Sequence, residues 1–140
     1  MFERAIDIRW SDLDPLGHVN NAAYATYLEE ARDRWLIRAL DGMTPIEQFV
    51  LAHIAIDYRA ELVLADETVT ATCEALQIGN SSFTTVETIV KRDGTVAASC
   101  EAVTVARDPA TGRSRPLRDD ERAALERELG DQPPRTGDSA

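Results

Sequence analysis

The residues best suited to chemistry lie close together in the loop-like segment 10–20, which contains Asp12, Asp14 and His18. Carboxylates and imidazoles can act as general bases or as nucleophiles. Directly after the segment, at Asn21, the pattern changes to helical periodicity, and the free amides and positive dipole end of a helix start can polarise a carbonyl oxygen. Spacing alone does not single these residues out, because aspartates beside a proline are typical of plain turns.

A long helix is predicted from Asn21 onward, because apolar side chains recur there at helical spacing. It should run for about 18 to 20 residues and end near Asp41 and Gly42, which are typical of a helix C-terminus. The apolar face consists of Tyr24, Tyr27, Leu28, Ala31 and Trp35.

Five other segments are rich in alternating apolar or β-branched residues and predict strands. Short polar turns between the last three favour antiparallel pairing. One strand, one long helix and four strands indicate an α+β fold in which an antiparallel sheet of about five strands wraps around the helix. The predicted strands are Phe2–Arg9, Val50–Arg59, Thr68–Ile78, Ser82–Lys91 and Val96–Arg107.

In the second predicted strand, the two faces differ in polarity. His53, Asp57 and Arg59 lie on one face, which suits solvent or a subunit contact. The other face is apolar, so we expect it to pack against the helix; it consists of Val50, Ala52, Ile54, Ile56 and Tyr58.

The length of 140 residues allows one domain, which we place at 1–129 with a short helix from Asp119 near its end. Residues 130–140 have the composition of a disordered tail. A net charge of −10 argues against nucleic acid or an anionic membrane as a partner. No apolar run is long enough for a membrane span and the N-terminus lacks a signal-peptide pattern, so we expect a cytoplasmic protein.

The two cysteines, Cys73 and Cys100, lie in strand-like segments and are expected to be buried free thiols. Neither has a recognisable nucleophile motif, which argues against a cysteine hydrolase. His18 and His53, the only histidines, share no ligand spacing, so no metal site is predicted.

The segment from Arg9 to Arg32, RWSDLDPLGHVNNAAYATYLEEAR, resembles the hotdog thioesterases of the 4-hydroxybenzoyl-CoA thioesterase type. Other family segments follow in order, so the resemblance covers residues 2–125. It implies a hotdog fold and hydrolysis of an acyl-CoA thioester without a cofactor. The other segments are Ile56-Asp57-Tyr58, Ile78-Gly79-Asn80-Ser81-Ser82-Phe83, and Thr111-Gly112-Arg113 with Pro116.

By this resemblance, Asp14 corresponds to the catalytic carboxylate, and a backbone amide at Asn21 binds the thioester oxygen. Two mechanisms stay open: Asp14 attacks directly to give an acyl-enzyme anhydride, or it orients and partly deprotonates a water molecule. His18 is a supporting catalytic candidate, although a loop histidine bonded to the backbone is an equal alternative. Asp12 is expected only to shape the turn.

The candidate substrate contacts come from three parts of the chain. Gly17 and Asn20 belong to the loop, and either Asn20 or Asn21 is expected to cap the helix. Tyr24 lies on the helix, where a role in the core is the alternative. Arg59, Lys91 and Arg92 lie at strand ends and could meet the phosphates of CoA. A further basic stretch, formed by Arg107, Arg113, Arg115 and Arg118, has the same potential.

Three other functions fit the same fold: an acyl-carrier-protein thioesterase, a non-catalytic acyl-CoA-binding protein, and a dehydratase, whose acid–base pair is not evident on the helix. Because one helix covers one face of a sheet with open edges, we expect a homodimer, and the family adds the possibility of a homotetramer with active sites between subunits.

Overall fold

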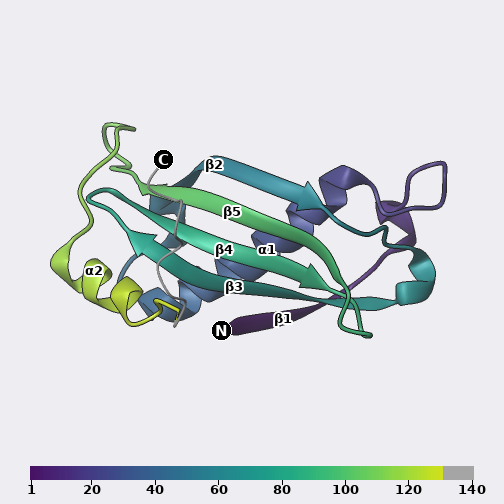
Figure 1. Cartoon of the computed structure of the whole chain (residues 1–140). Coiled ribbons are helices and arrows are strands. Elements are labelled where there is room, and N and C mark those ends of the chain that lie inside the picture. Colours follow the sequence, from purple (N-terminus) through teal and green to yellow (C-terminus); the bar gives the residue numbers. More distant parts are fainter. Residues whose placement is uncertain (131–140) are drawn as a thin grey trace.

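The computed structural model describes residues 1–130, and it contains the predicted strands and helices in the predicted order (Figure 1). The strands are β1 (Phe2–Asp7), β2 (Phe49–Tyr58), β3 (Thr68–Ile78), β4 (Ser82–Val90) and β5 (Val96–Ala106). The helices are α1 (Asn21–Leu40) and α2 (Asp119–Glu126), with single turns of 3₁₀ helix η1 (Trp10–Asp12), η2 (Ile46–Gln48) and η3 (Leu64–Asp66).

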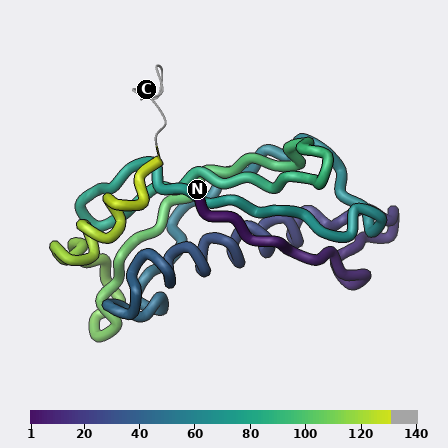
Figure 2. Tube along the Cα trace, turned by 90° about the horizontal axis from the view of Figure 1, so that it is seen from below, coloured from purple at the N-terminus to yellow at the C-terminus, as the bar shows by residue number. Residues whose placement is uncertain are grey.

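The five strands form one antiparallel sheet in the order β1-β3-β4-β5-β2, so β1 and β2 are its edges. Helix α1 runs along one face of this sheet (Figure 2). The prediction of an α+β hotdog fold with one long central helix is therefore confirmed. None of the helices within residues 1–130 is long and apolar enough to cross a membrane.

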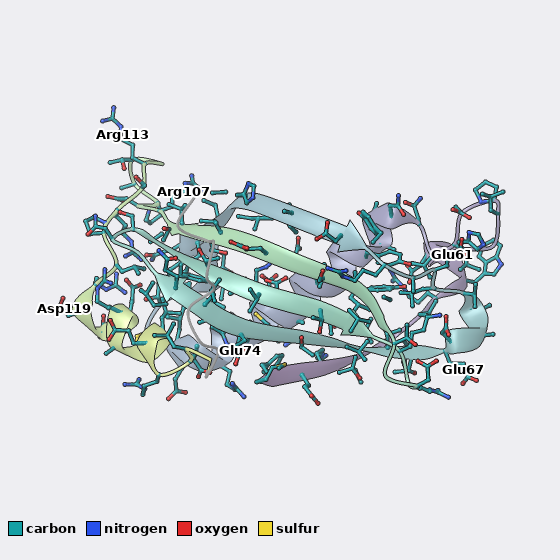
Figure 3. All side chains as sticks on the ribbon, in the orientation of Figure 1. Glu61, Glu67, Glu74, Arg107, Arg113 and Asp119 are labelled. Carbon is teal, nitrogen blue, oxygen red and sulfur yellow. The ribbon has the colours of Figure 1, made fainter. Side chains whose placement is uncertain are left out.

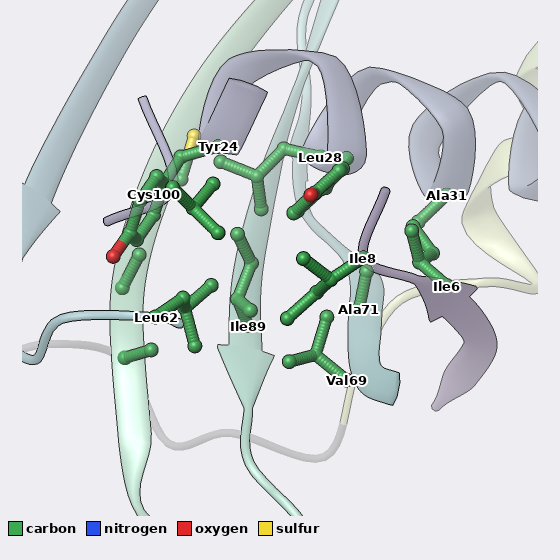
Figure 4. Packing of buried hydrophobic residues seen from close by; sticks show 14 of the residues in the cluster. Ile6, Ile8, Tyr24, Leu28, Ala31, Leu62, Val69, Ala71, Ile89 and Cys100 are labelled. Atoms are coloured by element: carbon green, nitrogen blue, oxygen red, sulfur yellow. The ribbon is translucent and has the colours of Figure 1, made fainter. Parts of the chain in front are cut away.

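Helix α1 is held to the sheet by the predicted apolar face. Tyr24, Leu28 and Ala31 pack with β-sheet residues in one buried cluster (Figure 4), and Trp35 belongs to a second cluster nearer the helix C-terminus. The helix ends at Asp41, whose left-handed backbone (φ 46°) lets its amide donate to the Ile37 carbonyl.

The expected facing of β2 is wrong in its first part. A bulge between Leu51 and His53 leaves Ala52 without a partner, which reverses the alternation. Before the bulge Leu51 pairs with the core-facing Thr104, so Leu51, and not Val50 or Ala52, lies on the helix side. After the bulge Ile54 and Ile56 pack against the core as predicted, but Tyr58 at the strand end is half exposed.

A buried ion pair lies between α1 and the centre of the sheet. The Arg32 guanidinium donates two hydrogen bonds to the Glu87 carboxylate, at 2.8 and 2.9 Å, and both side chains are almost inaccessible to solvent. Glu87 pairs in the sheet with Cys73 on one side and Cys100 on the other. Both cysteines are free and buried, as predicted, and burial raises the pKa of each thiol.

Helix α2 closes the end of the sheet farthest from the helix start. Its buried Glu121 accepts hydrogen bonds from Thr44, Arg115 and Arg118. Burial opposes ionisation, but these bonds outweigh it and lower the pKa of Glu121 to about 2. The amide of Gly130, the first residue of the expected disordered tail, donates to the carbonyl of Ala75, and residues 131–140 lie outside the described part.

Candidate active site

The loop that carries Asp14 is closed by hydrogen bonds to Asp14 itself. The Asp14 amide donates to the His18 carbonyl at 2.8 Å, and the Gly17 amide donates to the Asp14 carbonyl at 3.0 Å. Gly17 has a φ of +82°, a region that suits glycine. The carboxylate oxygen Oδ1 of Asp14 accepts from the amides of Leu16, at 2.9 Å, and His18, at 3.2 Å. Neither bond engages Oδ2, so Asp14 can hold the loop with one oxygen while the other meets a reactant.

Asp12 does more than shape the turn. Its carboxylate is buried and accepts from the Tyr27 hydroxyl at 2.7 Å and from the backbone and side chain of Arg9. Burial works against its ionisation, but the hydrogen bonds from Tyr27 and Arg9 outweigh it and lower its pKa. The physical reason is that Tyr27 lies on the buried face of α1, so Asp12 anchors the loop to the helix.

The start of α1 is capped in the way the sequence predicts. The side chain of Asn20 accepts from the Ala22 amide at 2.9 Å, and its carbonyl accepts from the Ala23 amide at 2.9 Å. Neither of these two hydrogen bonds uses the backbone N–H of Asn21, the first residue of the helix. The Tyr58 hydroxyl donates to the Asn21 carbonyl at 3.3 Å, which ties the end of β2 to the helix start.

A cleft of about 270 Å³ opens beside this helix start. It brings together five of the nine predicted site residues. Gly17 shapes the adjoining loop and Asn20 caps α1, but neither lines the cleft, and Lys91 and Arg92 do not line it either. The five residues that line it are Asp14, His18, Asn21, Tyr24 and Arg59.

Tyr24 is buried in the core and also lines the cleft. Its side chain is buried, its hydroxyl donates to the Ala60 carbonyl at 2.9 Å, and its ring meets that of Tyr58 edge to face at 5.1 Å between centroids. Burial raises the pKa of its hydroxyl. Tyr24 is therefore a neutral wall of the cleft.

The sequence analysis assigned no site role to four residues that line the cleft, of which Tyr58 and Glu61 have polar side chains; the other two are Val19 and Ala60. Tyr58 was expected on the apolar face of its strand and in a segment shared with the family, but without a role in the site. The Glu61 carboxylate lies 3.3 Å from His18 Nε2, and both groups line the cleft with Asp14. No motif marks Glu61. The position of Tyr58 at the end of a strand that faces the helix could have indicated its contact with the helix start.

The basic candidates are partly engaged by neighbouring carboxylates. Lys91 lies 3.7 Å from Asp66 in a mostly buried pair, and Arg92 lies 3.5 Å from Glu67 in an exposed pair. The Arg59 guanidinium donates to the Ser99 hydroxyl at 2.9 Å.

The second basic stretch lies elsewhere in the chain. Arg107 and Arg113 are at the opposite end of the sheet from Glu61 and the cleft (Figure 3). Arg115 and Arg118 of the same stretch bind Glu121.

The arrangement combines a carboxylate with a helix N-terminus at the edge of an open cleft. A carboxylate can attack a carbonyl carbon or activate water, and a helix N-terminus can stabilise the oxygen that becomes negative. Within residues 1–130, no group of three or more histidine, cysteine, aspartate or glutamate side chains is arranged to hold a metal ion.

The chain is similar to known thioesterases over almost its whole length. A model of the thioesterase-like superfamily matches residues 8–125. A thioesterase from Thermus thermophilus, solved with coenzyme A and Zn, is 32% identical, and the match covers 90% of this chain and 92% of that one at a TM-score of 0.81. A search of curated proteins gave no match.

Two more solved structures described as thioesterases are similar to almost the whole chain. A predicted thioesterase from Bacillus stearothermophilus is 28% identical over 94% of this chain and 98% of that one, with a TM-score of 0.85. A probable thioesterase from Escherichia coli is 29% identical over 93% of this chain and 100% of that one, with a TM-score of 0.75.

Proposed function

The chain belongs to the thioesterase-like superfamily, and from this premise we propose that it hydrolyses an acyl-CoA thioester to a free acid and CoA. The observation that carries the proposal is the cleft in which the Asp14 carboxylate lies beside the first residue of α1. The residues around Asp14 support assigning the chain to the 4-hydroxybenzoyl-CoA thioesterase type.

In the proposed mechanism, the amide of Asn21 and the positive end of α1 bind the thioester oxygen as it becomes negative. Asp14 then acts through Oδ2, because Oδ1 is held by two backbone amides. Either Oδ2 attacks the carbonyl carbon to form an anhydride that water opens, or it takes a proton from the water that attacks. In both cases the carbon–sulfur bond breaks and CoA leaves as the thiolate, which takes up a proton. His18, paired with Glu61, supports the loop at this step.

We propose a homodimer formed through β2, with a homotetramer as a further assembly. Of the two sheet edges, β1 has six residues, three of them charged, whereas β2 has ten residues and no carboxylate, lysine or arginine before Asp57. Val50 and Leu51 on β2 are 39% and 44% exposed, although both are apolar. A long, uncharged, exposed edge favours pairing with a second copy. Light scattering at micromolar concentration tests this, and a fully active monomer would contradict it.

Antiparallel pairing about a twofold axis near the middle of β2 would place the Tyr58 end of one strand beside the Phe49 end of its partner. Each cleft would then lie at the subunit interface. The same pairing would bring the partner's basic stretch, which includes Arg107 and Arg113, to the end of the sheet that holds the cleft. CoA phosphates would meet cations there, together with Arg59, Lys91 and Arg92.

We place the protein in the cytoplasm, where its buried free cysteines, Cys73 and Cys100, suit a reducing compartment. Acyl-CoA is favoured over an acyl carrier protein because the Thermus relative was solved with coenzyme A. A carrier-protein thioesterase and a non-catalytic acyl-CoA-binding protein are the competing functions.

A panel of acyl-CoA and acyl-carrier substrates, with detection of the released thiol, tests the proposal. Thiol release from acyl-CoA at rates well above the blank is the expected result. Release only from the carrier protein would favour the first alternative. Tight binding of acyl-CoA without release would favour the second.

A further inference from the structure

The loop that carries Asp14 is a short antiparallel hairpin. At its base the amide of Asn20 donates to the Asp12 carbonyl at 2.8 Å, and further out the amide of Asp14 donates to the His18 carbonyl at 2.8 Å. Asn20 is followed directly by the first residue of α1. The position of Asp14 relative to the helix start therefore depends on how this hairpin is held.

The return strand of the hairpin is held by the segment that follows β2. The amide of Val19 donates to the Leu62 carbonyl at 2.7 Å, and His18 pairs with Val63. These contacts hold only the strand that returns to the helix. The outgoing strand, which carries Asp14, needs an attachment of its own.

Asp12 attaches the outgoing strand to α1. Its carboxylate oxygen Oδ2 accepts from the Tyr27 hydroxyl at 2.7 Å and from the Arg9 amide at 3.0 Å. Asp12 is 7% exposed and Tyr27 is 3% exposed, so water does not compete for their bond. A hydrogen bond to a carboxylate is shorter and stronger than one between neutral groups. The contact between Asp12 and Tyr27 is therefore a firm link between the loop and the helix.

The hairpin meets α1 at two separate points. One is the chain itself, which passes from Asn20 into the helix at Asn21, and the other is the bond from Asp12 to Tyr27. At 1.5 Å per residue, Tyr27 lies about 9 Å along the helix from Asn21. Two points this far apart fix the tilt of the hairpin. With the first point alone, the outgoing strand could shift against the helix start.

We infer that the bond between Asp12 and Tyr27 is a positioning contact, which sets the distance between the Asp14 carboxylate and the Asn21 amide. The inference rests on the proposed function, in which these two groups act on the same thioester carbonyl. One group belongs to the loop and the other to the helix. Neither Asp12 nor Tyr27 lines the cleft, so both act through Asp14. A misplacement of about 1 Å at a reacting group can cost about a hundredfold in rate.

The variant Tyr27→Phe tests this, because it removes the hydroxyl and keeps the buried ring. Steady-state release of CoA should show a kcat lower by about ten- to a hundredfold, with KM changed by less than about twofold. Calorimetry with a non-hydrolysable acyl-CoA analogue should show that binding is retained, and thermal unfolding should show that the variant is folded at the assay temperature. Asp12→Ala removes the same bond from the loop side and should lower kcat at least as much.

Two comparisons separate positioning from a general loss of stability. Thr72→Val also removes a buried hydroxyl, which bonds Thr88 at 2.6 Å between β3 and β4 and outside the cleft, and it should leave kcat unchanged. In the Asp14→Asn protein, adding Tyr27→Phe should lower the residual rate by less than about twofold, because the group that it positions is already absent. A loss of folded protein would lower the residual rate by the same factor as in the wild type.

Three results would overturn the inference. If the wild type releases CoA, a wild-type kcat in Tyr27→Phe, or an equal fall in kcat with and without Asp14, would refute the positioning role and leave the proposed function standing. No release of CoA by the wild type from any acyl-CoA would refute both.

Discussion

Replacing Asp14 by asparagine should remove most of the hydrolytic activity while the protein stays folded. Oδ1 of the carboxylate accepts from the amides of Leu16 and His18, and the amide oxygen of asparagine can accept the same two bonds. The loop and the helix start should therefore survive, with a change in Tm of no more than about 2 °C, because no stabilising contact is lost. The substitution removes the charge and the basic Oδ2, which are the groups that the proposed mechanism uses.

The loss should fall on kcat, because the missing interaction is made mainly in the transition state. A factor of about 10²–10⁴ is typical of such roles and corresponds to a barrier increase of about 3–5 kcal/mol. Steady-state release of free CoA gives kcat and KM, and calorimetry with a non-hydrolysable acyl-CoA analogue checks that binding is retained. The measurement should use a substrate that the wild type hydrolyses well.

A matched control separates the chemistry of Asp14 from its turn geometry. Asp108 makes a similar local bond, accepting from the Ala110 amide at 2.8 Å, far from the cleft, so Asp108→Asn should leave kcat unchanged. Asp12 is a poor control because its bonds to Tyr27 and Arg9 anchor the loop. Wild-type kcat in Asp14→Asn, or a loss confined to KM, would refute the catalytic assignment.

Three further predictions concern the buried polar groups. Arg32→Met should lower the free energy of unfolding by about 3–5 kcal/mol, because it leaves the Glu87 carboxylate buried and without its cation. The double variant Arg32→Met with Glu87→Leu should recover much of the lost stability. Urea unfolding in which the double variant is no more stable than the single variant would contradict this. Glu121 has a pKa lowered from 4.5 to about 2 in the folded protein, so its contribution, up to about 3 kcal/mol, should be present above pH 4.5 and be lost as the pH falls towards 2. Glu121→Gln should remove this contribution, so its free energy of unfolding should fall less between neutral and acid pH than that of the wild type. An equal fall in the wild type and the variant would refute the prediction. Cys73 and Cys100, whose buried thiols have raised pKa values, should react with a thiol reagent only after unfolding, and rapid labelling of the native protein at neutral pH would be inconsistent with their burial.

The sequence was sufficient to predict most of the fold and the centre of the candidate site. The periodicity of residues 21–40 and the alternation in the later strands are local signals, and the structure follows them closely. The loop around Asp14 was recognisable by its resemblance to the hotdog thioesterases, because its turn residues alone are typical of plain turns. Asn20 was predictable as a cap because capping depends on residues two and three positions away.

What escaped prediction depends on contacts between distant parts of the chain. Glu61 meets His18 only because the end of β2 folds back beside the loop. The pairing of Arg32 with Glu87 joins residues 55 positions apart, and neither has a local sequence signal. The bulge at Ala52 could not be seen because each half of β2 alternates correctly by itself.

That bulge has a consequence for how the edge of the sheet tolerates a change in length. Leu51 pairs with Thr104 and His53 pairs with Val103, so the two pairs that flank Ala52 are consecutive steps of the ladder between β2 and β5. Deleting Ala52 would therefore give a regular strand in which Phe49 and Leu51 still lie on the helix side, and Ile54, Ile56 and Tyr58 would keep their places. The extra residue could be lost during evolution without disturbing the helix start or the loop of Asp14.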